Sequence, residues 1–564
     1  MHVELVGSGP AAAAVRAALE DVDATVSEVS SLTGADLGVV VAPAGSDQFA
    51  RADDACDRLV ACEIGGVGGH PIDGLDAAVS VFTPDSARFA DLRRRVASTT
   101  DASTNGPSGD RSAVRFAGAT AGRRAVRVLA GEPLGGTVVE LPGGERQFYP
   151  APDGSRDRSL DRSWRAVDLE TALDRAERAL DDRVGLLTSV GERESFPVPY
   201  YLATTADTTA YSDARAAEFA AGADPDWDRA FVKALGEGLE RYCAGVYRQS
   251  EFVVAPETNR ANPVSPVRFA RPDGYRQADR EEPVPWVEGE HLVTGTRVSL
   301  PAEFVHYPPP QERHKPAITT GLGLGNSGAE ALLSGLYEVI ERDATMLAWY
   351  STFEPLGLAV DDDRFRTLTK RARAEELDVT PLLVTQDVDV PVVAVAVHRE
   401  EGGEDAWPRF AMGSGADLDP VAAARAALAE ALQNWMELRA MGPERAAAEK
   451  AAIGDYAEFP PVARRLVDVE STVPAGSVGP DPLPEGAAEL DAVVDRVADA
   501  GLDAYAARTT TRDVAELGFE AVRVLIPEAQ PLFTGEPFFA ERAETVPREL
   551  GFEPRLDREY HPYP

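Results

Sequence analysis

The chain has 564 residues, which is enough for three or four domains at most and for large buried cores. Its formal net charge of -38 argues against nucleic acid and anionic membrane surfaces as partners. The 3 cysteines are too few, and odd in number, to make a disulfide framework, and they fit a reducing cytoplasm. We find no run of about 18 apolar residues and no signal peptide, so we expect a cytoplasmic protein without a transmembrane span.

Arginine supplies nearly all of the positive charge, because lysine occurs only at Lys233, Lys315, Lys370 and Lys450. Acidic, lysine-poor surfaces suit a cytosol at molar salt, where charge repulsion is screened within about 3 Å. The composition therefore predicts a halophilic, haloarchaeal source. An ordinary acidic cytoplasmic enzyme from a GC-rich genome is the alternative.

The chain begins with a pattern of strand, glycine-rich turn and helix over residues 2–20, and a second buried strand follows at 36–43. This is a βα unit of a parallel sheet, so we expect an α/β domain over 1–155. The turn at 7–11 (GSGPA) is able to cradle a phosphate at a helix N-terminus, but a purely structural turn is the preferred interpretation. Residues 99–113 are rich in Ser, Thr, Gly and Asp, which predicts an exposed linker.

From about residue 160 the pattern changes to longer amphipathic helices between short strands, which predicts an α+β domain over 156–564. Two apolar runs, at 381–388 and 391–399, are expected to be sheet strands. Helical periodicity is seen over 168–182, 234–247, 329–350 and 422–442.

Pairs of polar residues three apart lie on three of these helices, and such pairs share a helix face. The residues concerned are Glu237 and Glu240, Glu338 and Glu341, and Glu430 and Gln433, with Glu330 three turns before Glu341. Carboxylates among apolar neighbours are costly unless they are paired or bind a metal, and several facing one cavity would suit Mg²⁺. The same spacing also occurs on solvated helix faces with intrahelical ion pairs, and spacing alone does not decide between the two interpretations.

The segment 319–344 (TTGLGLGNSGAEALLSGLYEVIERDA) runs from a glycine-rich loop into the second glutamate pair. This order resembles the YcaO family, which has such a loop, then a glutamate, then E-x-x-E-R. The family's earlier A-L-x-E-x-x-E-R is matched at 234–241, and its later E-x-x-Q is matched at 430–433. The resemblance covers roughly 160–535. The sequence contains no G-x-x-x-x-G-K-[ST], so a P-loop enzyme is excluded.

The resemblance implies a fold and a set of site residues for ATP and Mg²⁺. It implies a YcaO-type ATP-binding catalytic domain in which Glu338 and Glu341 are catalytic. The Mg²⁺ ligands that it implies are Glu237, Glu240, Glu338, Glu341 and Glu430. The ATP contacts that it implies are Asn326, Glu330, Arg342, Gln433, Arg523, Arg165 and Thr171, the arginines because a guanidinium matches phosphate geometry.

The N-terminal third resembles the partner region of azoline cyclodehydratases, which has a degenerate ubiquitin-activating-enzyme-like α/β fold. Two zinc-binding C-x-x-C pairs of that region would fall at Arg88 and Asp91 and at Gly154 and Asp157, and neither place has a cysteine. We therefore expect no zinc. The C-terminal residues 561–564 (HPYP) partly resemble the proline-rich ends of azoline-forming members, with a disordered tail as the alternative.

The family's chemistry implies ATP-dependent phosphorylation of a peptide backbone amide. Azoline formation at Cys, Ser or Thr of a ribosomally made peptide, as in bacteriocin biosynthesis, is the first expectation. Thioamide formation and a non-catalytic docking role are the alternatives. The implied partners are a peptide or protein substrate and a leader-binding or sulfur-donor protein, and a homodimer is left open. His314 and Lys315, just before the glycine-rich loop, are candidates for substrate contact or for a base.

Overall fold

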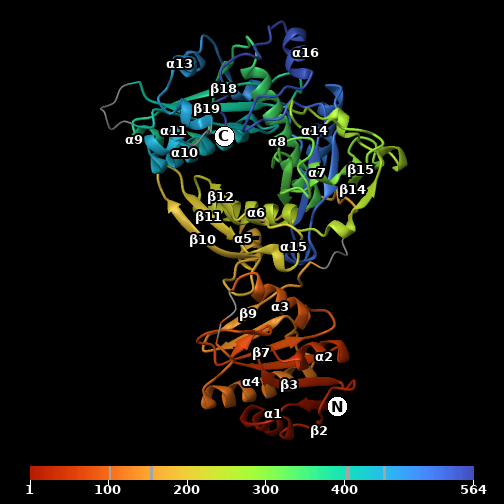
Figure 1. The fold of residues 1–564 in the computed structure, drawn as a ribbon. Coiled ribbons are helices and arrows are strands. Elements are labelled where there is room, and N and C mark those ends of the chain that lie inside the picture. Colours follow the sequence, from red (N-terminus) through yellow and green to blue (C-terminus); the bar gives the residue numbers. More distant parts are fainter. Residues whose placement is uncertain (101–102, 104, 153–156, 401–406, 449–451) are drawn as a thin grey trace.

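A computed structural model describes residues 1–564 apart from 101–102, 104, 153–156, 401–406 and 449–451. The chain folds into an N-terminal α/β part and a larger C-terminal part (Figure 1). The expected domain boundary at 155/156 falls outside the described residues and stays a prediction. In the part of the chain that the structure describes, none of the helices combines the length and the apolarity that a membrane crossing needs.

The N-terminal part is built on one seven-stranded sheet with the strand order β2-β1-β3-β4-β7-β8-β9. The pairs among the first four of these strands are parallel, as the βα pattern predicts, and the later pairs are antiparallel. The strands are β1 (His2–Val6), β2 (Thr25–Glu28), β3 (Leu37–Pro43), β4 (Leu59–Ile64), β7 (Ala77–Phe82), β8 (Thr137–Leu141) and β9 (Glu145–Gln147). A short pair, β5 (Gly66–Val67) and β6 (His70–Pro71), lies beside the sheet.

Helices cover both faces of this sheet, so it has two apolar cores. Helices α1 (Pro10–Glu20) and α4 (Arg111–Leu129) contribute to one core, and α2 (Asp47–Ala55) and α3 (Phe89–Ala97) contribute to the other. The expected linker at 99–113 is therefore shorter than predicted, because α4 begins at Arg111.

The glycine-rich turn after β1 has a structural reason for its glycines. Gly7 has φ 132°, and a Cβ there would lie 2.4 Å from the carbonyl oxygen of Val41. Gly9, with φ 88°, is the N-cap residue of α1. Both positions favour glycine without any ligand.

The C-terminal part contains three sheets. The three-stranded sheet is formed by β10 (Leu187–Glu194), β11 (Tyr200–Thr205) and β12 (Phe219–Ala223). The six-stranded sheet, in the order β13-β14-β22-β23-β16 with β15 paired to β14, contains β13 (Val253–Ala255), β14 (Val284–His291), β15 (Arg297–Pro301), β16 (Leu322–Gly325), β22 (Tyr505–Arg508) and β23 (Glu520–Leu525). The five-stranded sheet, in the order β20-β19-β18-β17-β21, contains β17 (Leu356–Ala359), β18 (Asp378–Leu383), β19 (Val392–His398), β20 (Phe410–Ala416) and β21 (Thr472–Pro474).

Each of these sheets carries one long helix, and these three helices hold the candidate glutamates. Helix α6 (Trp227–Gly245) packs on β11 and β12, α8 (Gly328–Trp349) packs on β16 and β23, and α10 (Pro420–Met441) packs on β19 and β20. The other helices are α5 (Leu169–Glu177), α7 (Ala302–Val305), α9 (Asp363–Ala374), α11 (Pro443–Ala448), α12 (Ala452–Tyr456), α13 (Pro461–Val467), α14 (Ala487–Asp499), α15 (Arg512–Leu517) and α16 (Arg542–Glu549). The expected order of an α/β domain and an α+β domain is confirmed.

A buried polar network joins the two parts. The guanidinium of Arg95, on α3, forms an ion pair with Asp513 on α15, and both side chains are 0% exposed. Arg95 also donates to the hydroxyl oxygen of Tyr242 (3.1 Å), which in turn donates to the Asp513 carboxylate (2.6 Å). Because Tyr242 lies on α6, the network ties the N-terminal part to a helix that carries candidate site residues.

Candidate nucleotide and metal site

The glycine-rich loop is held directly against the helix that follows it. A Cβ at Gly323 would lie 2.2 Å from the carbonyl oxygen of Ala331, so only glycine lets β16 approach α8 this closely. Ser327 caps α8 by accepting a hydrogen bond from the backbone N–H of Glu330 (3.4 Å). The Glu330 carboxylate accepts from the backbone N–H of Asn326 (2.9 Å), so these two expected ATP contacts lie together.

The second glutamate pair extends from the same helix. Glu338 accepts a hydrogen bond from the backbone N–H of Gly321 (2.9 Å), at the start of the glycine-rich loop. Glu341 accepts one from the hydroxyl of Ser414 on β20 (2.6 Å) and lies 3.3 Å from the Arg342 guanidinium. The structure thus places Glu338 and Glu341 between the glycine-rich loop and the five-stranded sheet.

The third helix brings Glu430 to the same place. Its carboxylate accepts a hydrogen bond from the backbone N–H of Ser414 (2.6 Å) and lies 3.7 Å from Arg342. Gln433, three residues later, donates to Glu437 (3.0 Å), which also accepts from the Tyr200 hydroxyl (2.8 Å). Gln433 is therefore linked to the neighbouring sheet and not to Arg342.

The glutamates form one electrostatic cluster, because the pKa values of three of them, Glu240, Glu341 and Glu430, are raised in part by other glutamates of the set. Burial, together with the charges of Glu338 and Glu237, raises the pKa of Glu240 to about 8. Burial, together with Glu341 and Glu338, raises the pKa of Glu430 to about 7. Burial and the nearby Glu338 also raise the pKa of Glu341. Glu338 thus acts on carboxylates from all three helices and lies at the centre of the cluster.

This cluster fits a divalent cation by its chemistry. Among the described residues, no group of three or more ligand-type side chains is already arranged around a metal position. The carboxylates of Glu338, Glu341 and Glu430 instead accept hydrogen bonds from Gly321 and Ser414. Partly buried like charges with raised pKa values nevertheless need positive charge nearby, and oxygen-only donors suit Mg²⁺. The interpretation as a merely solvated helix face does not fit side chains such as Glu341, which is 12% exposed.

Arginines surround the cluster. Arg523, on β23, is 2% exposed and donates to the carbonyl oxygens of Thr319 (3.0 Å) and Ile318 (2.9 Å). Burial lowers its pKa to about 10, although the charges of Glu338 and Glu240 act in the opposite direction. Arg241 forms an ion pair with Glu237 (2.8 Å), which also accepts from the backbone N–H of Ala221 (2.8 Å).

The two weakest sequence assignments have different surroundings. Arg165 donates to the carbonyl oxygens of Asn326 (2.5 Å) and Gly518 (3.3 Å), so it borders the glycine-rich loop. Thr171 is exposed in the first turn of α5, and its backbone N–H donates to the N-cap residue Asp168 (2.8 Å). No contact found in the described residues joins Thr171 to the glutamate cluster.

Sequence reasoning missed several polar residues of this site. Ser414, Glu437, Arg241 and Arg175 each touch an expected site residue, the last by donating to the Asn326 side chain (3.4 Å). Tyr200 joins them through Glu437. Only Arg241 stood in a quoted motif. A hydroxyl or an isolated basic residue outside a motif gives no sequence signal.

At the first expected zinc position, Arg88 and Asp91 form structural contacts at the start of α3. The backbone N–H of Arg88 donates to Asp91 (2.8 Å), which caps α3, and the Arg88 side chain pairs with Asp53 (3.1 Å). At the second position, Gly154 lies outside the described residues, and Asp157 accepts from the backbone N–H of Ser159 (2.9 Å). The absence of zinc stays a prediction.

The C-terminal tail is buried beside the glutamate cluster. His561 is 1% and Tyr563 is 2% exposed. Burial raises the pKa of Tyr563, and the charges of Glu341 and Arg342 also act on it. The alternative of a disordered tail is therefore wrong for these residues.

Comparisons with known proteins agree with this geometry. Residues 221–530 match the family described as YcaO cyclodehydratase, ATP- and Mg²⁺-binding. An uncharacterized protein of Methanothermobacter thermautotrophicus is 26% identical over 324 residues, which are 55% of this chain and 80% of that protein.

Two solved structures resemble the whole fold. A heterocyclase in complex with substrate and cofactor has a TM-score of 0.73 at 19% identity, covering 98% of this chain and 83% of that chain. The heterocyclase TruD has a TM-score of 0.66 at 17% identity, covering 98% of this chain and 81% of that chain. At this identity the likeness establishes the fold alone. The family match over more than half of the chain means that the chain belongs to the YcaO family and is an ATP-dependent enzyme of the cyclodehydratase type.

Proposed function

We propose that the protein uses ATP to phosphorylate the oxygen of a peptide backbone amide and closes a neighbouring Cys, Ser or Thr side chain into an azoline ring. The observation that carries this proposal is the cluster of five partly buried glutamates on three helices, bordered by Arg342 and Arg523. The cluster suits Mg²⁺, and the guanidinium groups suit phosphate oxygens.

The reaction balances as a dehydration driven by ATP. The side-chain sulfur or oxygen attacks the amide carbon, and the amide oxygen takes the γ-phosphoryl group from ATP. The bond from the side-chain sulfur or oxygen to the amide carbon closes the ring. The bond between that carbon and the phosphorylated oxygen then breaks, phosphate leaves, and the carbon–nitrogen bond of the ring becomes a double bond. Two protons depart, one from the attacking side chain and one from the amide nitrogen.

We assign the residues of this chain as follows. The proposed ligands for Mg²⁺ are Glu237, Glu240, Glu338, Glu341 and Glu430. The metal would neutralise phosphate charge. Asn326, Glu330 and Gln433 would contact the nucleotide. Arg342, Arg523 and Arg165 would contact phosphate oxygens, and Thr171 is the assignment with the least structural support.

The choice of an azoline product rests on the C-terminal tail. Its last residues are buried beside Glu341 and Arg342, and the tail partly resembles the proline-rich ends of azoline-forming members of the family. The solved heterocyclase with bound substrate shares the fold, which is compatible with a peptide substrate for this chain. Thioamide formation, in which sulfide attacks the same activated amide, is the alternative product. A leader-binding or sulfur-donor partner, a homodimer, and a place in bacteriocin biosynthesis belong to the same proposal.

A peptide-dependent ATPase assay tests the proposal. Release of ADP and phosphate should require a peptide rich in Cys, Ser or Thr. The mass of the peptide should fall by one water per ring if azolines form. Replacement of oxygen by sulfur, seen only when sulfide is supplied, would identify a thioamide synthetase instead. A rate of ATP turnover that is the same with and without each peptide tested would refute amide activation. The genes beside this one provide independent information, since a short Cys/Ser/Thr-rich reading frame would supply the substrate.

A further inference from the structure

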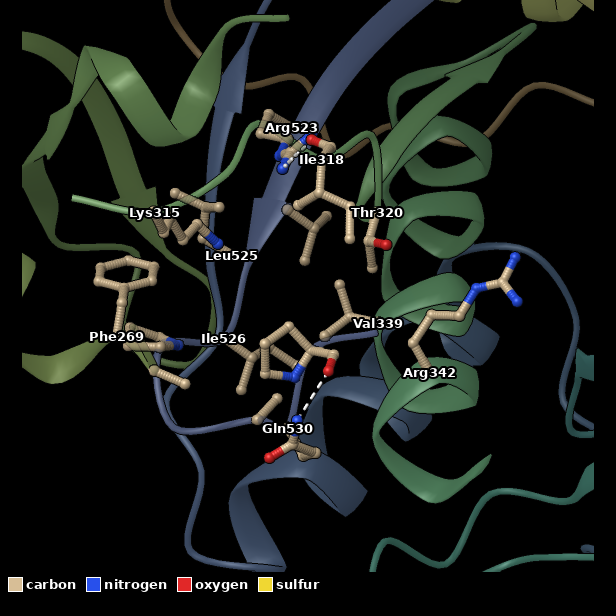
Figure 2. A pocket seen from close by; sticks show the side chains of 15 residues that line it. Phe269, Lys315, Ile318, Thr320, Val339, Arg342, Arg523, Leu525, Ile526 and Gln530 are labelled. Carbon is tan, nitrogen blue, oxygen red and sulfur yellow. Dashed lines mark hydrogen bonds between the residues drawn. The ribbon is translucent and has the colours of Figure 1, made fainter. Parts of the chain in front are cut away.

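A small cavity lies beside the glutamate cluster, between β23, α8 and the segment before β16 (Figure 2). Its volume is about 40 Å³. One water needs about 10–15 Å³ of such space, so the cavity has room for a group of a few heavy atoms but not for a large side chain. Three of its lining residues are basic, namely Lys315, Arg342 and Arg523, and most of the others are apolar.

Lys315 is a basic group of this cavity that has no carboxylate partner among the described residues. Its ammonium nitrogen lies 5.2 Å from the ring centroid of Phe304 and 5.7 Å from that of Phe269. Within the described residues, no carboxylate oxygen lies within ion-pairing distance of it. Glu303, the acidic residue whose charge acts on Lys315, accepts hydrogen bonds from the backbone N–H groups of Arg313 (2.8 Å) and His314 (2.6 Å) instead.

Carboxylates are in surplus in this chain, whose net charge is -38. Lys233 pairs with Asp224 (2.7 Å), whereas Lys315 lies beside the rings of Phe269 and Phe304. Burial and the nearby Arg523 lower the pKa of Lys315 to about 8, so its charge is costly in this place unless an anion joins it.

Arg523 adds a second positive charge to the lining of the same cavity. Its two terminal nitrogens bond to main-chain oxygens, but its Nε–H is buried and has no hydrogen-bond partner among the described residues. Arg342 lines the cavity from α8 and also pairs with Glu341 and Glu430. The cavity therefore borders the place where we put the phosphates of ATP.

We propose that this cavity is a phosphate site in which Lys315 and Arg523 hold the phosphoryl group that the reaction transfers, after it leaves the amide as free phosphate. The inference rests on the proposed function. When the carbon–oxygen bond of the phosphorylated adduct breaks, both electrons of that bond go to the phosphate oxygen, and the resulting anion needs positive charge. The Lys315 ammonium supplies a point charge, and the Arg523 guanidinium adds positive charge to the cavity wall.

Calorimetric titration of inorganic phosphate into the nucleotide-free, full-length protein tests this site. Lys315→Met should weaken phosphate binding at least about tenfold, because it removes the ammonium and keeps the bulk of the side chain. Lys370→Met, at an exposed lysine of α9, is the matched control and should bind phosphate as the wild type does. Ala529→Val, which reduces the cavity without changing charge, should also weaken phosphate binding and covers the case in which Lys315→Met fails to fold.

Parallel titrations with ATP and ADP show whether the cavity binds free phosphate or the γ-phosphate of ATP. Weaker phosphate binding with unchanged ATP and ADP affinity supports a site for free phosphate. Weaker ATP binding with unchanged ADP affinity supports a phosphoryl site that already holds the γ-phosphate of ATP. No phosphate binding by the wild type, or equal phosphate and ATP binding in wild type and both cavity variants, overturns the inference. These titrations need no peptide turnover, so a failure of amide activation would be seen separately in the ATPase assay.

Discussion

Removing one negative charge from the glutamate cluster should abolish catalysis without unfolding the protein. In Glu341→Gln, the amide oxygen still accepts the hydrogen bond from Ser414 (2.6 Å), but the charge that faces Arg342 at 3.3 Å is lost. At an effective dielectric constant of about 20, two unit charges at that separation attract by about 5 kcal/mol before desolvation is subtracted. Burial offsets much of this attraction, since it raises the pKa of Glu341, so we expect a small net change in stability.

The effect on ATP turnover should be much larger. Loss of one anionic ligand should weaken the proposed metal site by a few kcal/mol, which is a rate loss on the order of a hundredfold or more. Glu338→Gln should behave in the same way, because Glu338 lies at the centre of the cluster. Release of ADP with peptide present gives the rate, and circular dichroism reports the fold.

A matched control comes from a glutamate on a solvated helix face. Glu544 pairs with Arg548 one turn later on α16 (3.3 Å), and both side chains are more than half exposed. Glu544→Gln should change the free energy of unfolding by no more than about 0.5 kcal/mol and leave turnover unchanged. If Glu338→Gln and Glu341→Gln consume ATP as fast as this control, the cluster is not the metal site.

Four further outcomes are expected. Elemental analysis should find no stoichiometric zinc; about one zinc per chain would mean that residues other than those at 88, 91, 154 and 157 bind it. Circular dichroism should record loss of structure on dialysis to low salt, since at about 0.01 M the Debye length reaches about 30 Å and the acidic groups repel one another; full retention would count against a halophilic source. Arg95→Met should lower the free energy of unfolding by about 3–5 kcal/mol, because Asp513 is left buried and unpaired; a denaturant midpoint close to that of the wild type would contradict this. Without Mg²⁺ the melting temperature should fall as the pH rises from about 5 to about 8, because Glu240 and Glu430 have pKa values of about 8 and about 7 in the folded protein and bind protons that the unfolded chain has already released. Mg²⁺ should raise the melting temperature more at pH 8 than at pH 5. An equal effect of Mg²⁺ at both pH values would argue against these carboxylates as ligands.

The long helices and their glutamates could be predicted from the sequence because their signals are local. Apolar periodicity placed α8 and α10 within two residues of their observed ends, and Gly442, with φ 80°, marks the end of α10 as expected. The start of α6 at Trp227 was not predicted, because the first turn of this helix is polar. The N-cap residue Asp226 is the local sequence signal for this start.

The way in which the glutamates meet could not be predicted in this manner. The contact of Glu338 with the backbone of Gly321, and those of Glu341 and Glu430 with Ser414, depend on how sheets pack beside helices. A backbone N–H has no sequence signature, and a serine in a strand of small residues has almost none. Motif order indicated that the glutamates act together, but only the fold identifies Ser414 as the residue that links two of the helices.

The N-terminal third also contributes to the site, through an interaction that no local pattern reveals. Arg95 and Asp513 are 418 positions apart in sequence, yet they form a fully buried ion pair. Tyr242 bonds to both of them and lies two residues after Glu240 on α6. Because a buried, hydrogen-bonded tyrosine fixes the rotation of its helix, the N-terminal sheet holds the first glutamate pair in register with the other two helices. The N-terminal α/β part is therefore a structural support of the glutamate cluster.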